Sequence, residues 1–479
     1  MHFVGIGGIG LSAIARVLHA RGYTVSGSDA QRTALTEKLD SLGMTVTIGH
    51  RAEHVRGADL IIASSAVPQD NPEILAGQQA GIPVVKRAQI LGEMMAGKTS
   101  IAVAGTHGKT TTSALIAFVL TEAHLDPSYV VGGMLQDFGS NARHGNGPHF
   151  VIEADEYDHT FLGLLPSIAV VTVIEMDHPD CFRDLDEITG AFERFLHQLP
   201  DDGVAVGCAD QRRVRQLLAR LHHDRGIEIV TYGLELEADW TADKVQPNAW
   251  GGSDFEVMRR GVSVGRCGLR LTGLHNVANA LAALAVIDRL ELDMKLVLPL
   301  VSRFAGVTRR FELKGESKGI AVVDDYAHHP TEIRATLAAA RRRYGRRPIW
   351  AFFQPHTYSR TKVLLNEFAA SFDDADHVIV SEIYAAREQN SLGISARDLV
   401  KLMKHRDVRL VTTLQEAVDV LCAALRPGDV LLTLGAGDGY RVGEAVLCAL
   451  RGDVERGDRV TGCQVLDGSV FHKAVNSGS

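Results

Sequence analysis

The chain has 479 residues, which is too long for one ordinary core and suggests about three domains. Its 50 Lys and Arg against 58 Asp and Glu give a formal net charge of −8, and such a mildly acidic chain is a poor candidate for nucleic-acid binding. It has neither an apolar run of about 18 residues, as a membrane span needs, nor a signal peptide, so a cytoplasmic protein without membrane insertion is expected.

The first block, residues 1–98, alternates predicted strands with predicted helices. Strands are expected over 2–5, 23–26, 60–63 and 84–85, and a helix over 11–21. Alternation of strands and helices favours a parallel sheet with an α/β fold. This block is therefore predicted to be Rossmann-like.

A glycine loop, Gly5–Gly10, follows the first strand and matches G-x-G-x-x-G. Its glycines permit a tight turn and close approach of a ligand, and the helix that follows attracts phosphate at its N-terminus. Asp29 ends the second strand, where an acid often meets a ribose hydroxyl. These residues alone leave two interpretations open, a dinucleotide cofactor such as NAD or a tight turn without a ligand.

The second block, residues 99–308, contains a second phosphate-type loop, Gly105–Thr111, between a predicted strand at 100–104 and a predicted helix at 110–120. Successive backbone N–H groups of such a loop cradle phosphate oxygens. Lys109 is placed to neutralise β- and γ-phosphate charge, and Thr110 to bind Mg²⁺. The loop is shorter than G-x-x-x-x-G-K-[ST], but its strand–loop–helix context favours a nucleotide site over a chance match.

Polar residues follow other strands of this block. Glu153–Glu156 ends the strand predicted at 150–152, where carboxylates bind Mg²⁺ or form a solvated acidic loop. His178 follows the strand at 168–173, and a lone histidine is more often structural. Asn276 and Asn279 lie one turn apart on a helix predicted at 276–290, where they contact a ligand or cap the helix.

The third block, residues 309–455, follows a short basic hinge at 306–310 and has predicted strands at 320–323, 348–353, 377–380 and 430–434. The loops Asp324–Glu332 and Gln354–Arg360 each follow one of these strands. Both are therefore expected at the carboxyl edge of one sheet, where α/β proteins bind ligands.

The remaining tail, 456–479, is predicted to be disordered or to be an addition peculiar to this chain. The six cysteines contain no C-x-x-C pair, which favours scattered thiols over a disulfide framework or a zinc site.

Together and in this order, the motifs resemble the Mur ligase family as far as about Leu450. The resemblance implies three domains: a Rossmann-like domain that binds the UDP part of the substrate rather than NAD, a central P-loop ATPase-type domain with a mostly parallel sheet, and a C-terminal Rossmann-like α/β domain that binds the amino acid.

The resemblance is closest to members that join L-alanine to the carboxylate of UDP-N-acetylmuramate, with ATP and Mg²⁺, in peptidoglycan precursor synthesis. The implied reaction passes through an acyl phosphate that the amine attacks. The alternative is a related ligase that adds another amino acid or a peptide to the same nucleotide sugar. An NAD-dependent oxidoreductase leaves Gly105–Thr111 unexplained, and an inactive regulator leaves the full set of phosphate and metal residues unexplained.

The resemblance implies roles residue by residue. The residues implied to bind ATP are Gly105, Thr106, His107, Gly108, Lys109, Thr110, Thr111, Asn276, Asn279, Arg310 and Asp325. The implied metal ligands are Thr110, Glu153 and His178. The UDP-sugar would contact Gly7, Gly8, Ile9, Gly10, Asp29, Ser64 and Ser65, and the muramate and amino acid would contact Tyr326, His328 and Arg360. The implied catalytic residues are Lys109, Glu153, His178, Arg310 and His328.

Two positions depart from the family pattern. Val173 stands where the family usually has Asn, so a local hydrogen bond is expected to be lost or replaced. Thr357 stands where some relatives have Arg, which removes one candidate charge contact to the substrate.

Overall fold

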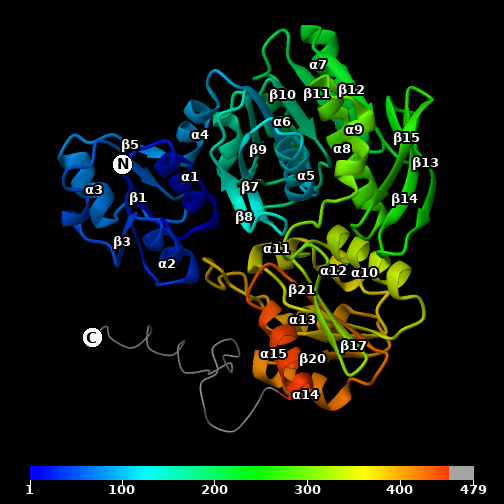
Figure 1. The fold of residues 1–479 in the computed structure, drawn as a ribbon. Coiled ribbons are helices and arrows are strands. Elements are labelled where there is room, and N and C mark those ends of the chain that lie inside the picture. The colour runs from blue at the N-terminus through cyan, green and yellow to red at the C-terminus, as the bar shows by residue number, and fades with distance from the viewer. Residues whose placement is uncertain (453–479) are drawn as a thin grey trace, which may run out of the picture. The chain divides into compact units, whose positions relative to one another are not determined.

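A computed structural model describes residues 1–452, which divide into two compact units, one from Met1 to Thr308 and one that begins at Arg309 (Figure 1). The first unit contains two β-sheets and the second contains one. Each unit is an α/β structure, as the sequence predicts.

The N-terminal sheet has five parallel strands in the order β3-β2-β1-β4-β5. The strands are β1 (His2–Val4), β2 (Ser26–Asp29), β3 (Thr45–Ile48), β4 (Ile61–Ala63) and β5 (Val84–Lys86). The helices are α1 (Ile9–Ala20), α2 (Ala34–Ser41), η1 (Ala52–Val55), α3 (Pro72–Gln79) and α4 (Arg87–Met95).

The second strand lies three residues later than the sequence predicts. Gly27 pairs with Phe3 of β1, and a Cβ at Gly27 would come within 2.6 Å of the Ile6 side chain. Only small residues fit between β1 and the loop that follows it, whereas Tyr23 stays half exposed. The apolar residues before position 26 therefore belong to the connection.

The central sheet has ten strands in the order β15-β14-β13-β12-β11-β10-β6-β9-β7-β8. The strands are β6 (Thr99–Ala104), β7 (Ser128–Leu135), β8 (Ser140–Arg143), β9 (His149–Glu153), β10 (Ile168–Val171), β11 (Val204–Cys208), β12 (Glu228–Tyr232), β13 (Trp240–Pro247), β14 (Ser253–Arg259) and β15 (Val262–Leu269). The helices are α5 (Lys109–Glu122), η2 (Tyr157–Gly163), α6 (Leu185–Leu196), α7 (Arg212–Arg225), α8 (Leu274–Arg289) and α9 (Met294–Val301). Its middle strands are parallel, and antiparallel hairpins extend both edges.

Helices cover both faces of the middle of the central sheet, and its parallel strands β6, β10 and β11 are accordingly mostly apolar. Ile101 and Val103 of β6 pack in one cluster with α5 and α8, whereas Ala102 and Ala104 pack on the other face with α6 and α7. Because both faces of β6 are packed in this way, the loop that leaves its carboxyl end starts from a rigid strand.

The sheet of the second unit has six strands in the order β16-β17-β21-β18-β19-β20. The strands are β16 (Glu312–Ser317), β17 (Ile320–Asp325), β18 (Ile349–Phe353), β19 (His377–Val380), β20 (Val408–Leu410) and β21 (Val430–Leu434). The helices are α10 (Pro330–Tyr344), α11 (Tyr358–Val363), α12 (Leu365–Ala369), α13 (Ala396–Leu402), α14 (Leu414–Ala424) and α15 (Tyr440–Arg451). All its strands run parallel except β16, which is antiparallel to β17.

Within residues 1–452, none of the helices combines the length and apolarity needed to cross a membrane. The predicted tail at 456–479 lies outside the described residues. Within the described residues, free thiols occur at Cys181, Cys208, Cys267 and Cys422, as the sequence predicts for these positions.

Candidate functional site

The loop Gly105–Thr111 joins β6 to α5 and has little freedom. Gly105 has φ +132°, and a Cβ there would lie 1.9 Å from Oγ1 of Thr172. Gly108 has φ +83° at the N-terminal end of α5. The backbone N–H of Thr106 donates to the carbonyl of Val173 at 2.8 Å. Glycine is required at both positions, and the loop leads directly into a helix N-terminus suited to phosphate.

Lys109 projects from the first turn of α5 into a group of acids. Its ammonium donates to the carbonyl of Gly105 at 2.6 Å and to Oε1 of Glu156 at 2.9 Å. Burial alone would lower the pKa of Lys109, but the charges of Glu156, Asp155 and Glu153 raise it overall. Lys109 therefore stays a cation at the phosphate loop.

Glu156 is fully buried, and its second oxygen, Oε2, has no hydrogen-bond partner. Burial raises the pKa of Glu156, although the charge of Lys109 opposes the rise. Nε2 of His178 lies 3.7 Å from Oε1 of the same carboxylate. Glu156 thus links Lys109 to His178, a role that the sequence did not indicate within its acidic run.

Glu153 ends β9 beside the hydroxyl of Thr110. Oγ1 of Thr110 lies 3.1 Å from Oε1 of Glu153, and the backbone N–H of Gly132 donates to Oε2 at 2.6 Å. A Cβ at Gly132 would come within 2.4 Å of this carboxylate, so glycine permits the approach. Mg²⁺ prefers oxygen ligands, and this hydroxyl and carboxylate supply them side by side.

The helix α8 brings one of its two asparagines, Asn279, to the phosphate loop. Nδ2 of Asn276 donates to the carbonyl of Thr272 at 2.8 Å, and Nδ2 of Asn279 donates to Oδ1 of Asn276 at 3.1 Å. A Cβ at Gly108 would lie 2.6 Å from Oδ1 of Asn279. Asn276 is therefore tied to its own helix end, while Asn279 reaches the start of α5.

In the N-terminal sheet, the glycine loop and Asp29 come together. The backbone N–H of Gly7 donates to Oδ2 of Asp29 at 2.8 Å, and a Cβ at Gly5 would lie 3.1 Å from Cβ of Ser64. Ser65 instead donates to Oδ2 of Asp158 at 2.6 Å. The structure thus groups the glycine loop, Asp29 and Ser64, and it joins Ser65 to the short helix η2 that follows β9.

Arg87, which none of the sequence motifs includes, lies between the first glycine loop and the acidic run Glu153–Glu156. A Cβ at Gly10 would lie 2.7 Å from Nη1 of Arg87, and Nη2 contacts Oδ2 of Asp155 at 2.5 Å. Burial alone would raise the pKa of Asp155, but the charges of Arg87 and Lys109 lower it. The signal in the sequence was a basic residue directly after the strand β5.

In the second unit, Asp325 ends β17 and orders the loop around it. Its Oδ2 accepts from the backbone N–H of Phe311 at 2.7 Å, and its Oδ1 accepts from that of Ala327 at 2.8 Å. Burial raises the pKa of Asp325 to about 6, although the charge of Arg310 and these two hydrogen bonds oppose the rise.

Two arginines flank the ring of Tyr326, with guanidinium carbons 5.1 Å (Arg309) and 5.2 Å (Arg310) from its centroid. Arg310 also lies 3.7 Å from Glu332. Arg309 donates to Asp324 at 3.0 Å, so it braces the end of β17.

The loops after β17 and β18 meet through histidine, as the shared edge predicts. The rings of Tyr326 and His328 are 5.2 Å apart, and those of His328 and His356 are 6.0 Å apart. Nη1 of Arg360, a buried residue, donates to the carbonyl of His356 at 2.8 Å. The structure therefore connects Tyr326, His328 and Arg360 through a series of contacts that includes His356.

The two departures from the family pattern have structural counterparts. Val173 holds the phosphate loop through its backbone carbonyl, so this contact needs no side-chain amide. Oγ1 of Thr357 donates to Oε1 of Glu388 at 2.5 Å, and the backbone N–H of Ser359 donates to Oε2 at 2.8 Å. At position 357 a hydroxyl thus binds the carboxylate of a neighbouring loop.

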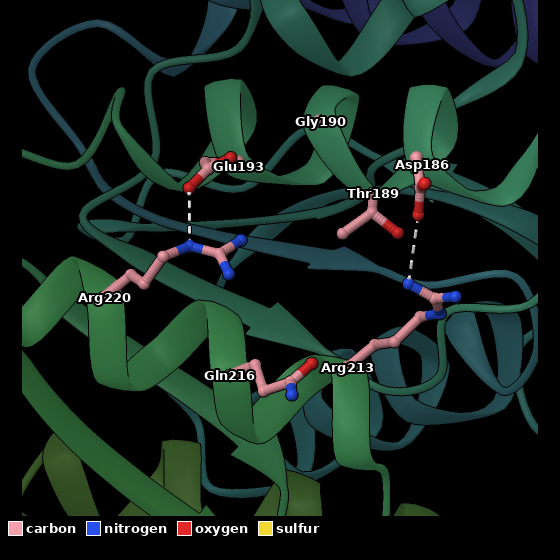
Figure 2. Close-up of a pocket in the computed structure, with 7 residues that line it drawn as sticks. All are labelled: Asp186, Thr189, Gly190, Glu193, Arg213, Gln216 and Arg220. Atoms are coloured by element: carbon pink, nitrogen blue, oxygen red, sulfur yellow. Dashed lines mark hydrogen bonds and ion pairs between the residues drawn. The ribbon is translucent and has the colours of Figure 1, made fainter.

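A separate hollow of about 240 Å³ lies between α6 and α7 (Figure 2). Arg213 pairs with Asp186 at 3.4 Å and Arg220 with Glu193 at 2.9 Å across it. None of the predicted site residues line this hollow. Exposed ion pairs of this kind contribute little to stability, and the hollow is separate from the phosphate loops.

Three family models match successive parts of the chain. They describe the Mur ligase family catalytic domain over residues 1–99, the Mur ligase middle domain over 103–287, and the Mur ligase glutamate ligase domain over 309–437. The chain belongs to the Mur ligase family. The resemblance found from the motifs and the three-domain α/β fold are thereby confirmed.

This Mur ligase is 45% identical to the UDP-N-acetylmuramate--L-alanine ligase of Geobacter sp. (strain M21), over 94% of this chain and 97% of that protein. It is equally similar to the enzyme of that name from Myxococcus xanthus (strain DK1622), over 94% and 95%. Among solved structures, UDP-N-acetylmuramate-alanine ligase MurC from Thermotoga maritima matches with TM-score 0.79 and 30% identity, over 94% and 99% of the chains. A murein peptide ligase from Psychrobacter arcticus matches with TM-score 0.71 and 27% identity, over 94% and 98%.

Proposed function

We propose that this Mur ligase joins L-alanine to the muramate carboxylate of UDP-N-acetylmuramate and converts ATP to ADP and phosphate. The observation that carries the proposal is the 45% identity over 94% of the chain to ligases named for this reaction. The phosphate loop with Lys109, Thr110 and Glu153 supports it, because the reaction must bring a carboxylate against a triphosphate.

The proposed reaction has two steps. The muramate carboxylate attacks the γ-phosphorus of ATP, forming an acyl phosphate and releasing ADP. The amine of L-alanine then attacks the acyl carbon, and the tetrahedral intermediate expels phosphate as the amide forms. Both reacting groups of the first step are anions, so cations must lower their repulsion.

Residues of the first unit are assigned to this first step. Lys109 binds the β- and γ-phosphates, since its ammonium is held at the phosphate loop. Thr110 and Glu153 hold Mg²⁺, and His178 is assigned to a second ion. Mg²⁺, when bound, supplies charge neutralisation to the triphosphate.

The remaining assignments follow the family motifs. ATP is proposed to contact Gly105, Thr106, His107, Gly108, Thr111, Asn276, Asn279, Arg310 and Asp325. The UDP-sugar is proposed to contact Gly7, Gly8, Ile9, Gly10, Asp29, Ser64 and Ser65. The muramate and L-alanine are proposed to contact Tyr326, His328 and Arg360. We further propose domains at 1–98, 99–308 and 309–455 and a cytoplasmic location.

A ligand-omission matrix tests the function. Purified protein is incubated with UDP-N-acetylmuramate, ATP, Mg²⁺ and L-alanine, and phosphate release is measured with each component left out in turn. We expect release only when all four are present, with the L-alanyl product detected by mass spectrometry. Phosphate release that is independent of the amino acid, or absent with every Mur substrate, would refute the proposal.

A second candidate is a ligase that adds a preformed peptide, which the similarity to the Psychrobacter arcticus murein peptide ligase supports. The same assay with L-alanine, glycine, L-serine and an L-alanyl peptide as competing acceptors separates the two. A missing methyl group costs only about 1–3 kcal/mol of discrimination, so weak use of glycine is compatible with the L-alanine ligase. Preferred use of the peptide favours the second candidate.

A further inference from the structure

A buried carboxylate lies behind the proposed nucleotide-sugar site. Glu73, in the first turn of α3, has no exposed surface. Its backbone N–H donates to Oδ1 of Asn71 at 2.9 Å, which fixes the start of the helix. No role in the proposed reaction is assigned to this residue, and buried glutamates are rare unless they are paired.

Several hydrogen-bonding groups converge on this carboxylate. Oε1 lies 2.6 Å from Nδ1 of His54 and accepts from the backbone N–H of Arg51 at 3.2 Å. Oε2 accepts from the hydroxyl of Ser28 and lies 3.3 Å from Nδ1 of His50. Nε2 of His2 is 3.5 Å from the same oxygen.

These hydrogen bonds explain the ionisation of Glu73. Burial alone would raise its pKa, but the hydrogen bonds from Ser28, His54 and the backbone of Arg51, together with the nearby ring of His2, lower it to about 2. An ionised carboxylate only accepts hydrogen bonds, and every neighbour here can donate one. A glutamine would place an N–H₂ group against some of these donors.

Ser28 connects this carboxylate to the proposed substrate loop. Its carbonyl accepts from the backbone N–H groups of Gly5 at 2.8 Å and Ile6 at 3.0 Å. The next residue, Asp29, accepts from the N–H of Gly7 at 2.8 Å. The glycine loop is therefore held by hydrogen bonds to two consecutive residues, Ser28 and Asp29. The hydroxyl of Ser28 in turn donates to the carboxylate of Glu73.

The carboxylate also holds the neighbouring strand end. The backbone N–H of Gly49 donates to the carbonyl of Asp29 at 2.8 Å, and Arg51, two residues later, donates to Glu73. The carboxylate of Glu73, at the start of α3, thus accepts hydrogen bonds from the end of β2 and from the segment that follows β3. We propose that Glu73 is a positioning residue for the nucleotide sugar, acting through Ser28 on the glycine loop and Asp29.

This inference rests on the proposed function, since it takes the glycine loop as the UDP-sugar site. Glu73→Gln keeps size but adds donors, and Glu37→Gln, an exposed residue of α2, is the matched control. We expect the KM for UDP-N-acetylmuramate to rise about tenfold in Glu73→Gln, because hydrogen bonds to a charged group are lost. The KM values for ATP and L-alanine and the kcat should change less than about twofold.

Ser28→Ala provides the second variant, because it removes the same hydrogen bond while leaving Glu73 ionised. It should raise the same KM, and adding Glu73→Gln to it should raise that KM by less than the product of the single effects. If Glu73→Gln does not fold, Ser28→Ala alone decides the question. Isothermal titration with UDP should rank the variants by dissociation constant in the same order as by their KM for UDP-N-acetylmuramate.

The outcomes separate the two proposals. A wild type that neither binds UDP nor uses the nucleotide sugar refutes the proposed function. A normal wild type with an unchanged nucleotide-sugar KM in both variants refutes only the role of Glu73. Equal rises in all three KM values, together with a lower Tm, show that Glu73 serves stability alone and also overturn the inference.

Discussion

The ammonium of Lys109 lies 2.9 Å from Oε1 of Glu156, a carboxylate with no exposed surface. The two charges come from different elements, since Lys109 begins α5 and Glu156 follows β9. A buried pair of this kind costs desolvation on both sides, so removing one partner leaves an uncompensated charge. Lys109, which is proposed to bind phosphate, therefore also contributes to the stability of the first unit.

We predict that Lys109→Ala lowers phosphate release by about 10²–10³-fold or more, because it removes a cation from the transferring phosphate. It should also lower the Tm, since Glu156 then stays buried without its cation. Phosphate release and thermal unfolding by circular dichroism measure the two effects.

The double variant Lys109→Ala/Glu156→Gln separates the loss of activity from the loss of stability. It should recover much of the lost Tm, because it removes the unpaired charge, but no activity. Recovery of activity along with the Tm would show that Lys109 acts only by stabilising the fold.

Glu153→Gln is predicted to raise the Mg²⁺ concentration needed for half-maximal activity by about 10- to 100-fold. The substitution replaces a charged carboxylate, a candidate ligand for Mg²⁺, with a neutral amide. Oε1 of this carboxylate lies 3.1 Å from Oγ1 of Thr110. Glu122→Gln, at the other end of α5 in an ion pair with Arg303, is the matched control and should behave as wild type. An unchanged Mg²⁺ dependence of Glu153→Gln would contradict its assignment as a ligand.

Gly105→Ala should destabilise the first unit by well over 2 kcal/mol and abolish activity. A Cβ there meets Oγ1 of Thr172 at 1.9 Å, and that hydroxyl is held by the carbonyls of Ala104 and His107. Gly226→Ala, with φ +68° and open space around its Cβ, should cost only about 1–2 kcal/mol. Similar Tm losses in the two variants would show that the loop relaxes around the clash.

Asp325 gives the second unit a pH dependence. Its pKa in the fold is raised to about 6, above the usual value near 3.8, so the folded state binds its proton more tightly than the unfolded chain does. The stability that this provides is complete below about pH 4 and is lost as the pH rises through 6, a change of about 3 kcal/mol. Asp325→Asn should remove this slope, which denaturant unfolding between pH 4 and 7 measures. The same slope in both proteins would contradict the raised pKa.

The motifs determined the family of this chain and the type of each loop. Glycine positions such as Gly105 and Gly108 carry a backbone requirement that is legible in the sequence, because a side chain fits neither their φ angle nor their surroundings. The alternation of strands and helices predicted an α/β fold in each of the three blocks. Burial of a strand on both faces leaves a continuous apolar run, which can be recognised in the sequence. Local chemistry of this kind needs no long-range information.

The tertiary structure decided which charges meet. Arg87 and Asp155 are 68 positions apart, and Glu73 and Ser28 are 45 apart, yet each pair is in contact. The start of β2 was likewise set by its pairing with β1 rather than by the hydropathy of residues 23–26. The 479 residues and the net charge of −8 describe an acidic chain, and the local motif Gly105–Thr111 already places Lys109, but only folding brings Arg87 to the first glycine loop at Gly10. Long-range packing fixes these contacts, and no local pattern in the sequence encodes them.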